Sequence, residues 1–124
     1  MILLDTHIVY WIVHRGQRMK AFRWLERYQP WTVSPVSLLE MQVLFESGRI
    51  PYITHFASVL AEDPRFDLGD LQLTELIEHA TPLTWTRDPF DRLLCAHSLA
   101  HRLPFCTADG TIREHHKLLP RELK

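Results

Sequence analysis

The stretch RDPFDRLLCAHSLAHRLPFCTAD, residues 87–109, contains a helix signal followed directly by a strand signal. Asp88 followed by Pro89 is typical of a helix start, because proline has no N–H to leave unpaired there and aspartate accepts a free backbone N–H. We therefore predict a helix over residues 89–101, with Asp88 as its N-cap, and a strand over residues 104–107.

The rest of the chain alternates short apolar runs with helical patterns. This alternation favours an α/β protein whose central, mostly parallel sheet is covered by helices on both faces. Including the strand above, we expect about five strands. The other predicted strands cover residues 2–4, 31–34, 66–68 and 117–119, and the other predicted helices cover residues 7–14, 17–28, 35–47, 54–62 and 71–79, with a short one near residue 111.

Size and composition indicate a single domain with a hydrophobic core, over residues 1–124. Of the 124 residues, 46% are hydrophobic, and 14 Lys+Arg against 15 Asp+Glu give a formal net charge of −1. This balance argues against a globally basic nucleic-acid binder and leaves room for a local basic patch.

The chain has the features of a reduced, intracellular protein. Cys95 and Cys106 form no CxxC motif, and a chain of this size needs no disulfide to fold. The apolar start MILLDTHIVYWIV is interrupted by Asp5 and has no Lys or Arg before it, so it is a poor signal peptide. It is also too short to span a membrane. We therefore expect a cytoplasmic protein without membrane association.

Four acidic residues fall at or near the carboxyl ends of predicted strands, where sites in parallel sheets usually form. Asp5 and Asp109 each follow a strand, while Glu40 and Asp91 lie in helices that follow strands. Each has a structural alternative: Asp5 and Asp109 as cap or turn residues, and Asp91 as a carboxylate favoured by the helix dipole. Their joint placement at one edge of the sheet favours a shared site.

Glu40 depends on where its helix begins. Ser37-Leu-Leu-Glu40 spells a capping box, in which Glu40 would be structural. Ser34-Pro35 offers a competing start that places Glu40 in the second turn, among apolar side chains. A glutamate in that environment is unfavourable unless something compensates its charge, and a bound cation would do so.

Four carboxylates in one place would raise one another's pKa and destabilise the fold unless they were neutralised. A hard divalent cation is the simplest means, because Mg²⁺ and Mn²⁺ prefer oxygen ligands. One or two such ions activate a water and stabilise the oxygens of a displacement at phosphorus. The acids therefore indicate metal-dependent phosphodiester hydrolysis.

Three segments together resemble the PIN-domain family, most closely its bacterial VapC-type toxins, which are the ribonuclease halves of toxin–antitoxin pairs. They are LLDTH at 3–7, VSLLEMQVLFESGRI at 36–50 and RDPFDRLLCAHSLAHRLPFCTAD at 87–109. Carried over residue by residue, the resemblance assigns a supporting role to Thr107, as the hydroxyl that helps to hold the acidic cluster. It assigns the family's catalytic and metal-binding quartet to Asp5, Glu40, Asp91 and Asp109.

The resemblance implies a three-layer α/β/α sandwich and Mg²⁺- or Mn²⁺-dependent endoribonuclease activity. It also implies homodimerisation, inhibition by a cognate antitoxin, and assembly into larger toxin–antitoxin complexes. Arg87, Arg15 and Lys20 are candidates for contact with RNA phosphates, with a solvated face as the structural alternative. Two other functions stay open: a non-catalytic RNA- or protein-binding module that kept the fold, and a DNA-directed nuclease.

Overall fold

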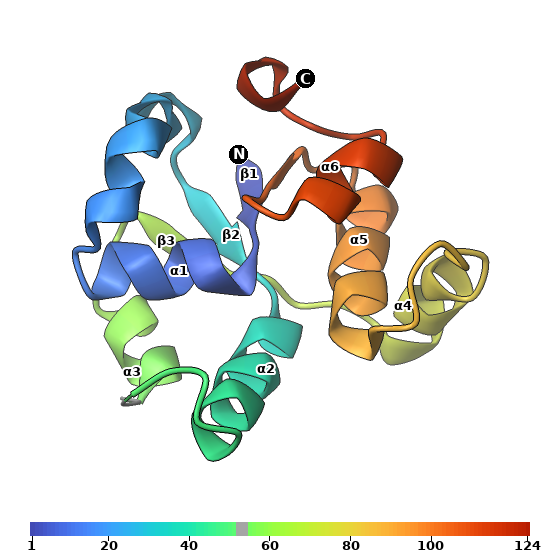
Figure 1. Cartoon of the computed structure of the whole chain (residues 1–124), viewed down its shortest axis with the longest axis horizontal. Helices are drawn as coiled ribbons and strands as arrows, with labels where there is room; N and C mark the ends of the chain where they lie inside the picture. Colours follow the sequence, from blue (N-terminus) through green and yellow to red (C-terminus); the bar gives the residue numbers. More distant parts are fainter. Residues whose placement is uncertain (52–54) are drawn as a thin grey trace.

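The computed structural model describes residues 1–51 and 55–124, in which four short strands form one sheet surrounded by helices (Figure 1). The strands are β1 (Ile2–Leu4), β2 (Trp31–Val33), β3 (Phe66–Leu68) and β4 (Phe105–Cys106). The helices are α1 (Thr6–Val13), α2 (Pro35–Glu46), α3 (Phe56–Ala61), α4 (Leu73–Ala80), α5 (Pro89–His101) and α6 (Gly110–His115), with 3₁₀ helices η1 (Gln17–Tyr28) and η2 (Arg121–Leu123). Within these described ranges, no helix combines the length and the apolar character needed to cross a membrane.

The sheet has the strand order β3-β2-β1-β4, and every neighbouring pair is parallel. The chain builds from β1 to β2 and β3, and then crosses to the other side of β1 to add β4. The direction of winding therefore reverses between β1 and β4. In open parallel sheets, ligands bind beyond the carboxyl ends of the strands at such a reversal. Here those ends are followed by Asp5 and by Thr107.

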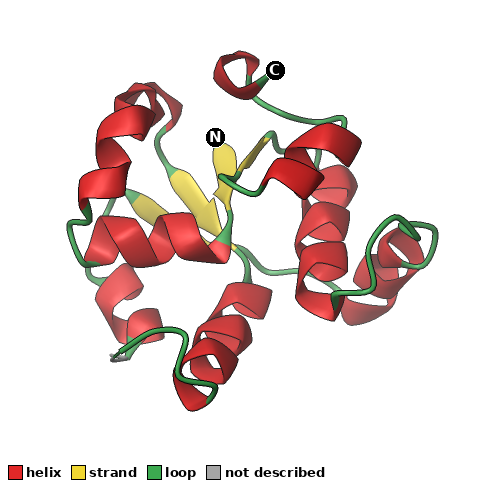
Figure 2. Cartoon of the chain, in the orientation of Figure 1, coloured by secondary structure: helices red, strands yellow, loops and turns green. Residues whose placement is uncertain are grey.

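Both faces of the sheet are covered by helices, because successive side chains of a strand point to opposite sides. Ile2 and Leu4 pack into a core that includes residues of α1, η1, α2 and α3. Leu3 packs on the other face, with Leu94 of α5 and Ile112 of α6. Figure 2 shows the strands enclosed between the two groups of helices. The predicted α/β/α sandwich is confirmed.

The sheet differs from the prediction in the number of strands, which is four in the described residues where about five were expected. The predicted strand over residues 117–119 is wrong. The Leu118 carbonyl accepts a hydrogen bond from the Phe105 N–H at 2.9 Å, but residues 117–119 do not pair as a strand with any described residue. The chain then turns at Pro120, so that Leu119 and Leu123 are buried against the core instead of extending the sheet edge.

The predicted helix over residues 17–28 forms, but as the 3₁₀ helix η1 with a kink at Phe22. Four of its side chains that pack into the core follow a spacing of three, namely Met19, Phe22, Leu25 and Tyr28, while the half-buried Trp24 packs beside them. Residues three apart lie one above the other in a 3₁₀ helix, so this spacing aligns all four toward the core. Of the predicted helix over residues 54–62, the structure shows α3, and residue 54 lies outside the described residues.

Candidate active site

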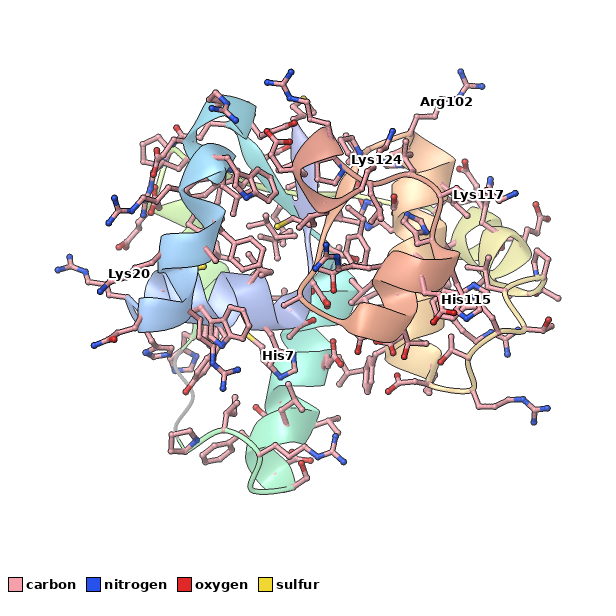
Figure 3. All side chains as sticks on the ribbon, turned by 45° about the horizontal axis from the view of Figure 1, so that its top comes forward. His7, Lys20, Arg102, His115, Lys117 and Lys124 are labelled. Carbon is pink, nitrogen blue, oxygen red and sulfur yellow. The ribbon has the colours of Figure 1, made fainter. Side chains whose placement is uncertain are left out.

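The structure brings all four predicted acids to one cavity of about 280 Å³, which we call the acid cavity. Asp5 reaches it from the end of β1 and Asp109 from the end of β4, while Glu40 comes from α2 and Asp91 from α5. The cavity therefore lies where the winding of the sheet reverses. Figure 3 shows the labelled His7 at the start of α1, on the side of α2. Besides the four acids, the lining residues are His7, Trp11, Arg18, Leu44, Arg49, Asp88 and Ala108.

Asp5 and Asp109 start helices as well as lining the cavity. The Asp5 Oδ1 accepts a hydrogen bond from the Thr6 N–H at 2.8 Å at the start of α1. The Asp109 Oδ1 accepts one from the Ile112 N–H at 2.9 Å at the start of α6. Helix N-termini favour negative charge. The cap interpretation of both residues is therefore correct, and it is compatible with a place in the cavity.

Asp88 begins α5, as predicted, because its Oδ1 accepts hydrogen bonds from the N–H groups of Phe90 at 2.8 Å and Asp91 at 3.2 Å. Asp91 is thereby placed in the first turn. Among the described residues, none donates a hydrogen bond to its carboxylate, so both oxygens remain available. Asp88 also lines the acid cavity, which its role as a cap did not indicate.

The helix that carries Glu40 begins at Pro35, with the Ser34 Oγ accepting the Val36 N–H at 3.2 Å. This start places Glu40 in the second turn and excludes the alternative in which Ser37 and Glu40 form a capping box. Only 8% of the Glu40 surface is exposed. The residue is thus a buried acid, as the competing start predicted, but it lies beside the other acids of the cavity as well as beside apolar side chains.

Two buried threonines, Thr6 and Thr107, fix the orientation of the acids. The Thr107 Oγ1 donates to the Asp5 Oδ2 at 2.6 Å and accepts from the Asp109 N–H at 3.0 Å, so it links the ends of β1 and β4. The Thr6 hydroxyl bonds to the Glu40 Oε1 and lies 2.9 Å from the Ser37 Oγ. Sequence reasoning missed Thr6, although its place directly after the first acid, at the start of α1, was a usable signal.

The Thr6 hydroxyl carries one proton, so its two contacts cannot both be donations. When Glu40 is ionised, Thr6 donates to it and Ser37 donates to Thr6. When Glu40 is protonated, the same positions allow the chain to run in the opposite direction, from Glu40 through Thr6 to Ser37. This short chain of hydroxyls therefore accommodates both protonation states of Glu40 without moving a heavy atom.

The acid cavity holds more negative charge than its surroundings compensate. Burial raises the pKa of Asp91 to about 7, with further increases from Asp88, Asp5, Asp109 and Glu40. Burial likewise raises the pKa of Glu40 to about 7, against the lowering effect of the Thr6 hydrogen bond. The pKa of Asp5 is raised by burial, although Thr107 and Thr6 both donate to it. A proton or a cation would relieve this strain.

The donor set suits a hard divalent cation, but the acids are not gathered as ready-made ligands. Within residues 1–51 and 55–124, no three His, Cys, Asp or Glu side chains stand together as a metal site. Mg²⁺ usually keeps several of its waters and binds only a few carboxylates directly. The cavity, at about 280 Å³, has room for such a hydrated ion among the free oxygens of Asp91, Glu40 and Asp109.

Arg87, Arg15 and Lys20, the three basic candidates named above, do not line the acid cavity. Arg18 and Arg49 line the acid cavity. Arg15 lines a separate cavity, and Lys20 and Arg87 are exposed outside the lining (Figure 3 labels Lys20). Arg49 was missed. Arg49 follows the turn at the end of α2. Gly48 after a helical pattern indicates such a turn, but it does not indicate that the next residue lines the cavity.

Comparison with known proteins places this geometry in a family. The family model described as "PIN domain" matches residues 2–118. Ribonuclease VapC22 of Mycobacterium tuberculosis (strain ATCC 25618 / H37Rv) is 30% identical over 119 residues, which cover 92% of this chain and 91% of that protein. No solved structure matched the chain. The chain therefore belongs to the PIN-domain family, as a VapC-type member.

Proposed function

We propose that the protein is a metal-dependent endoribonuclease, the toxin of a toxin–antitoxin pair. The observation that carries this proposal is the acid cavity, where Asp5, Glu40, Asp91 and Asp109 meet at the reversal of a parallel sheet. The family and the ribonuclease named among its relatives support the choice of RNA.

One or two Mg²⁺ or Mn²⁺ ions would be held by the four acids of the cavity, Asp5, Glu40, Asp91 and Asp109. Such an ion, when bound, supplies an activated water and stabilises the negative charge that develops on the phosphodiester. The fit is supported by the burial of Glu40 and Asp91 beside other carboxylates, which raises the pKa of both to about 7. No described arginine forms an ion pair with any of the four, so that charge remains available to a cation.

The other residues of the site act by positioning. Thr107 keeps the Asp5 carboxylate fixed through its 2.6 Å hydrogen bond. Thr6 holds Glu40 and, with Ser37, can take up either direction of proton donation. Asp91 accepts no such bond from a described residue and is therefore the acid that is free to reorient toward a ligand.

We propose that the protein works in the cytoplasm, as a homodimer that a cognate antitoxin inhibits within a larger complex. Exposed apolar side chains on the two helices that flank α5 support an interface there. Leu39 of α2 is 60% exposed, and Leu73 and Ile77 of α4 are 68% and 48% exposed. Light scattering on the purified protein measures the dimer directly, and a monomer at micromolar concentration would contradict it.

The test of the activity is cleavage of RNA with Mg²⁺ or Mn²⁺ and its loss in EDTA. Asp91→Asn should remove most of the activity and leave the protein folded, because no described hydrogen bond to the carboxylate is lost. Asp67→Asn is a matched control, since Asp67 is an exposed aspartate on β3. Unchanged cleavage by the Asp91 variant would count against the assignment of the site.

One observation favours a second candidate, a non-catalytic RNA-binding module: in the described part of the chain the acids are not gathered as a metal site. RNA binding without cleavage, over a broad panel of RNAs and both ions, would favour it. A DNA-directed nuclease shares the chemistry of the proposal. Placing a 2′-deoxy nucleotide at the cleaved position separates the two substrates, because only RNA carries the 2′-hydroxyl.

A further inference from the structure

Two arginines, Arg18 and Arg49, line the acid cavity beside five carboxylates without pairing with any of them. The ion pairs among the described residues involve Arg27, Arg65 and Arg121 instead. Both side chains are exposed at the mouth of the cavity. Because, among the described residues, the two arginines form no ion pair with the acids, they are available to bind an anion that enters the cavity.

The Arg18 side chain and the Arg49 backbone each make a defined contact. The Arg18 guanidinium lies 5.1 Å from the centre of the Trp11 ring, a cation–π contact with a side chain that also lines the cavity. Arg49 follows Gly48, whose φ of 78° ends α2, and its N–H donates to the Leu44 carbonyl at 2.8 Å. The two cations thus come from separate elements, η1 and the turn after α2.

A second cavity of about 280 Å³ adjoins the first and shares Glu40, Leu44, Arg49 and Asp88 with it. Its remaining wall is largely apolar and includes Val43 and the ring-bearing Phe90. Phe90 is half-buried, so part of its side chain is accessible. Arg49 therefore lies where the acid cavity meets a second cavity whose remaining wall is largely apolar.

We propose that single-stranded RNA crosses the acid cavity with one phosphate on Arg18 and another on Arg49, and that the base beyond Arg49 enters the adjoining cavity against Phe90. This inference rests on the proposed function. Arginine binds phosphate through charge-assisted hydrogen bonds, and bases stack on aromatic side chains with little regard to sequence. With a formal net charge of −1, the protein needs such local cations to hold a polyanion next to its acids.

The rival explanation is that the arginines only reduce repulsion among the acids. It makes opposite predictions. Removing a cation that only neutralises the acids would strengthen the binding of Mg²⁺. It would change RNA affinity no more than the loss of any other positive charge on the protein. Removing a phosphate ligand weakens RNA binding specifically and lowers its dependence on salt, because fewer counterions are released.

The experiment measures the binding of a short, labelled, mixed-sequence single-stranded RNA by fluorescence anisotropy over a series of salt concentrations. All proteins carry Asp91→Asn, and Mg²⁺ is present. The variants are Arg18→Gln, Arg49→Gln and Phe90→Leu, the last of which keeps an apolar side chain. Arg102→Gln is the matched control: Arg102 is exposed at the end of α5, well away from His7 (Figure 3).

We expect Arg18→Gln and Arg49→Gln each to weaken binding several-fold and to reduce the magnitude of the slope of log K against log salt by about 0.7, the value for one phosphate contact on a single strand. Phe90→Leu should weaken binding with an unchanged slope. Arg102→Gln should match the parent. Unfolding temperatures equal to that of the parent show that a loss is not structural.

The inference is overturned if the two arginine variants bind RNA like Arg102→Gln, or if the parent does not bind RNA. It is also overturned if, in proteins that keep Asp91, the main effect of the two substitutions is tighter Mg²⁺ binding, measured as a larger rise of Tm with Mg²⁺. These results are separate from a failure of the proposed function, which is tested by cleavage. A protein that binds RNA with the expected pattern but never cuts it would retain the binding path and lose the nuclease assignment.

Discussion

Replacing Asp91 by asparagine should stabilise the metal-free protein at neutral and mildly alkaline pH, even though it should abolish activity. Burial and four neighbouring carboxylates raise the pKa of Asp91 from 3.8 to about 7. The folded state therefore binds this proton more tightly than the unfolded state does. Stability that is fully present below pH 3.8 is lost as the pH rises toward 7. Asparagine carries no charge to lose.

The size of the effect follows from the shift. A change of about three pKa units corresponds to about 4 kcal/mol at 1.36 kcal/mol per unit. Asp91 is only half-buried and titrates together with Glu40, so solvent screening and coupling reduce this figure. Asparagine also loses the favourable interaction of a negative charge with the N-terminus of α5, which lowers the stability gain by less than ~1 kcal/mol. We expect a net gain of about 1–3 kcal/mol.

For 124 residues, an unfolding entropy of about 2.1 cal/mol/K per residue converts each kcal/mol into roughly 4 °C of Tm. The assay is calorimetry in EDTA from pH 4.5 to 8, comparing the wild type, Asp91→Asn and the control Asp67→Asn. The wild type and the control should lose Tm across this range, and Asp91→Asn should lose less. An Asp91 variant that is less stable than the wild type at pH 8, or that follows the same pH profile, would refute the reasoning.

Three further predictions concern the neighbours of Asp91. Thr107→Val removes the donor to the Asp5 Oδ2 and should cost about 1–3 kcal/mol of stability along with most of the activity. Thr107→Ser should retain both stability and activity. Chemical denaturation measures the stability of the two variants, and RNA cleavage measures their activity. Asp88→Ala should lower the free energy of unfolding by about 1 kcal/mol, because it removes the N-cap of α5. Asp88→Asn should keep the cap. Because Asp88 raises the pKa of both Glu40 and Asp91, this variant should lose stability at lower pH than the wild type. Mg²⁺ should raise the Tm of the wild type at pH 8 and have a much smaller effect on Glu40→Gln, and an equal rise in both would remove Glu40 from the proposed ligands.

Local signals accounted for the parts of the site that begin helices. Ser34-Pro35 and Asp88-Pro89 each placed a helix start correctly, and these starts put Glu40 in the second turn and Asp91 in the first. The approach of the four acids followed from a general rule about the ends of parallel strands and not from their own neighbours in sequence. That rule could be applied because the sequence pattern predicted the alternation of strands and helices.

The features that were not predicted depend on contacts distant in sequence. Arg49 lines the acid cavity because of how α2 packs beside α5 and α1, which no local pattern encodes. The predicted strand over residues 117–119 does not form, because Leu119 and Leu123 are buried against the core instead. The sequence predicted a helix over residues 17–28 without its type, and a spacing of three occurs in both α-helices and 3₁₀ helices.

The same side chains that begin helices also build the acid cavity, and this shared use determines which acids respond to a ligand. Asp5 and Asp109 each have an oxygen tied to a helix N–H, and Asp5 has its second oxygen tied to Thr107. These bonds hold both carboxylates in place, although burial still raises the pKa of Asp5. Glu40 and Asp91 lack such support from backbone N–H groups, and theirs are the pKa values near 7. The two acids at the strand ends are therefore held by the helices that they begin, while the two acids carried by α2 and α5 have no backbone donor among the described residues and are freer to adjust to a divalent cation.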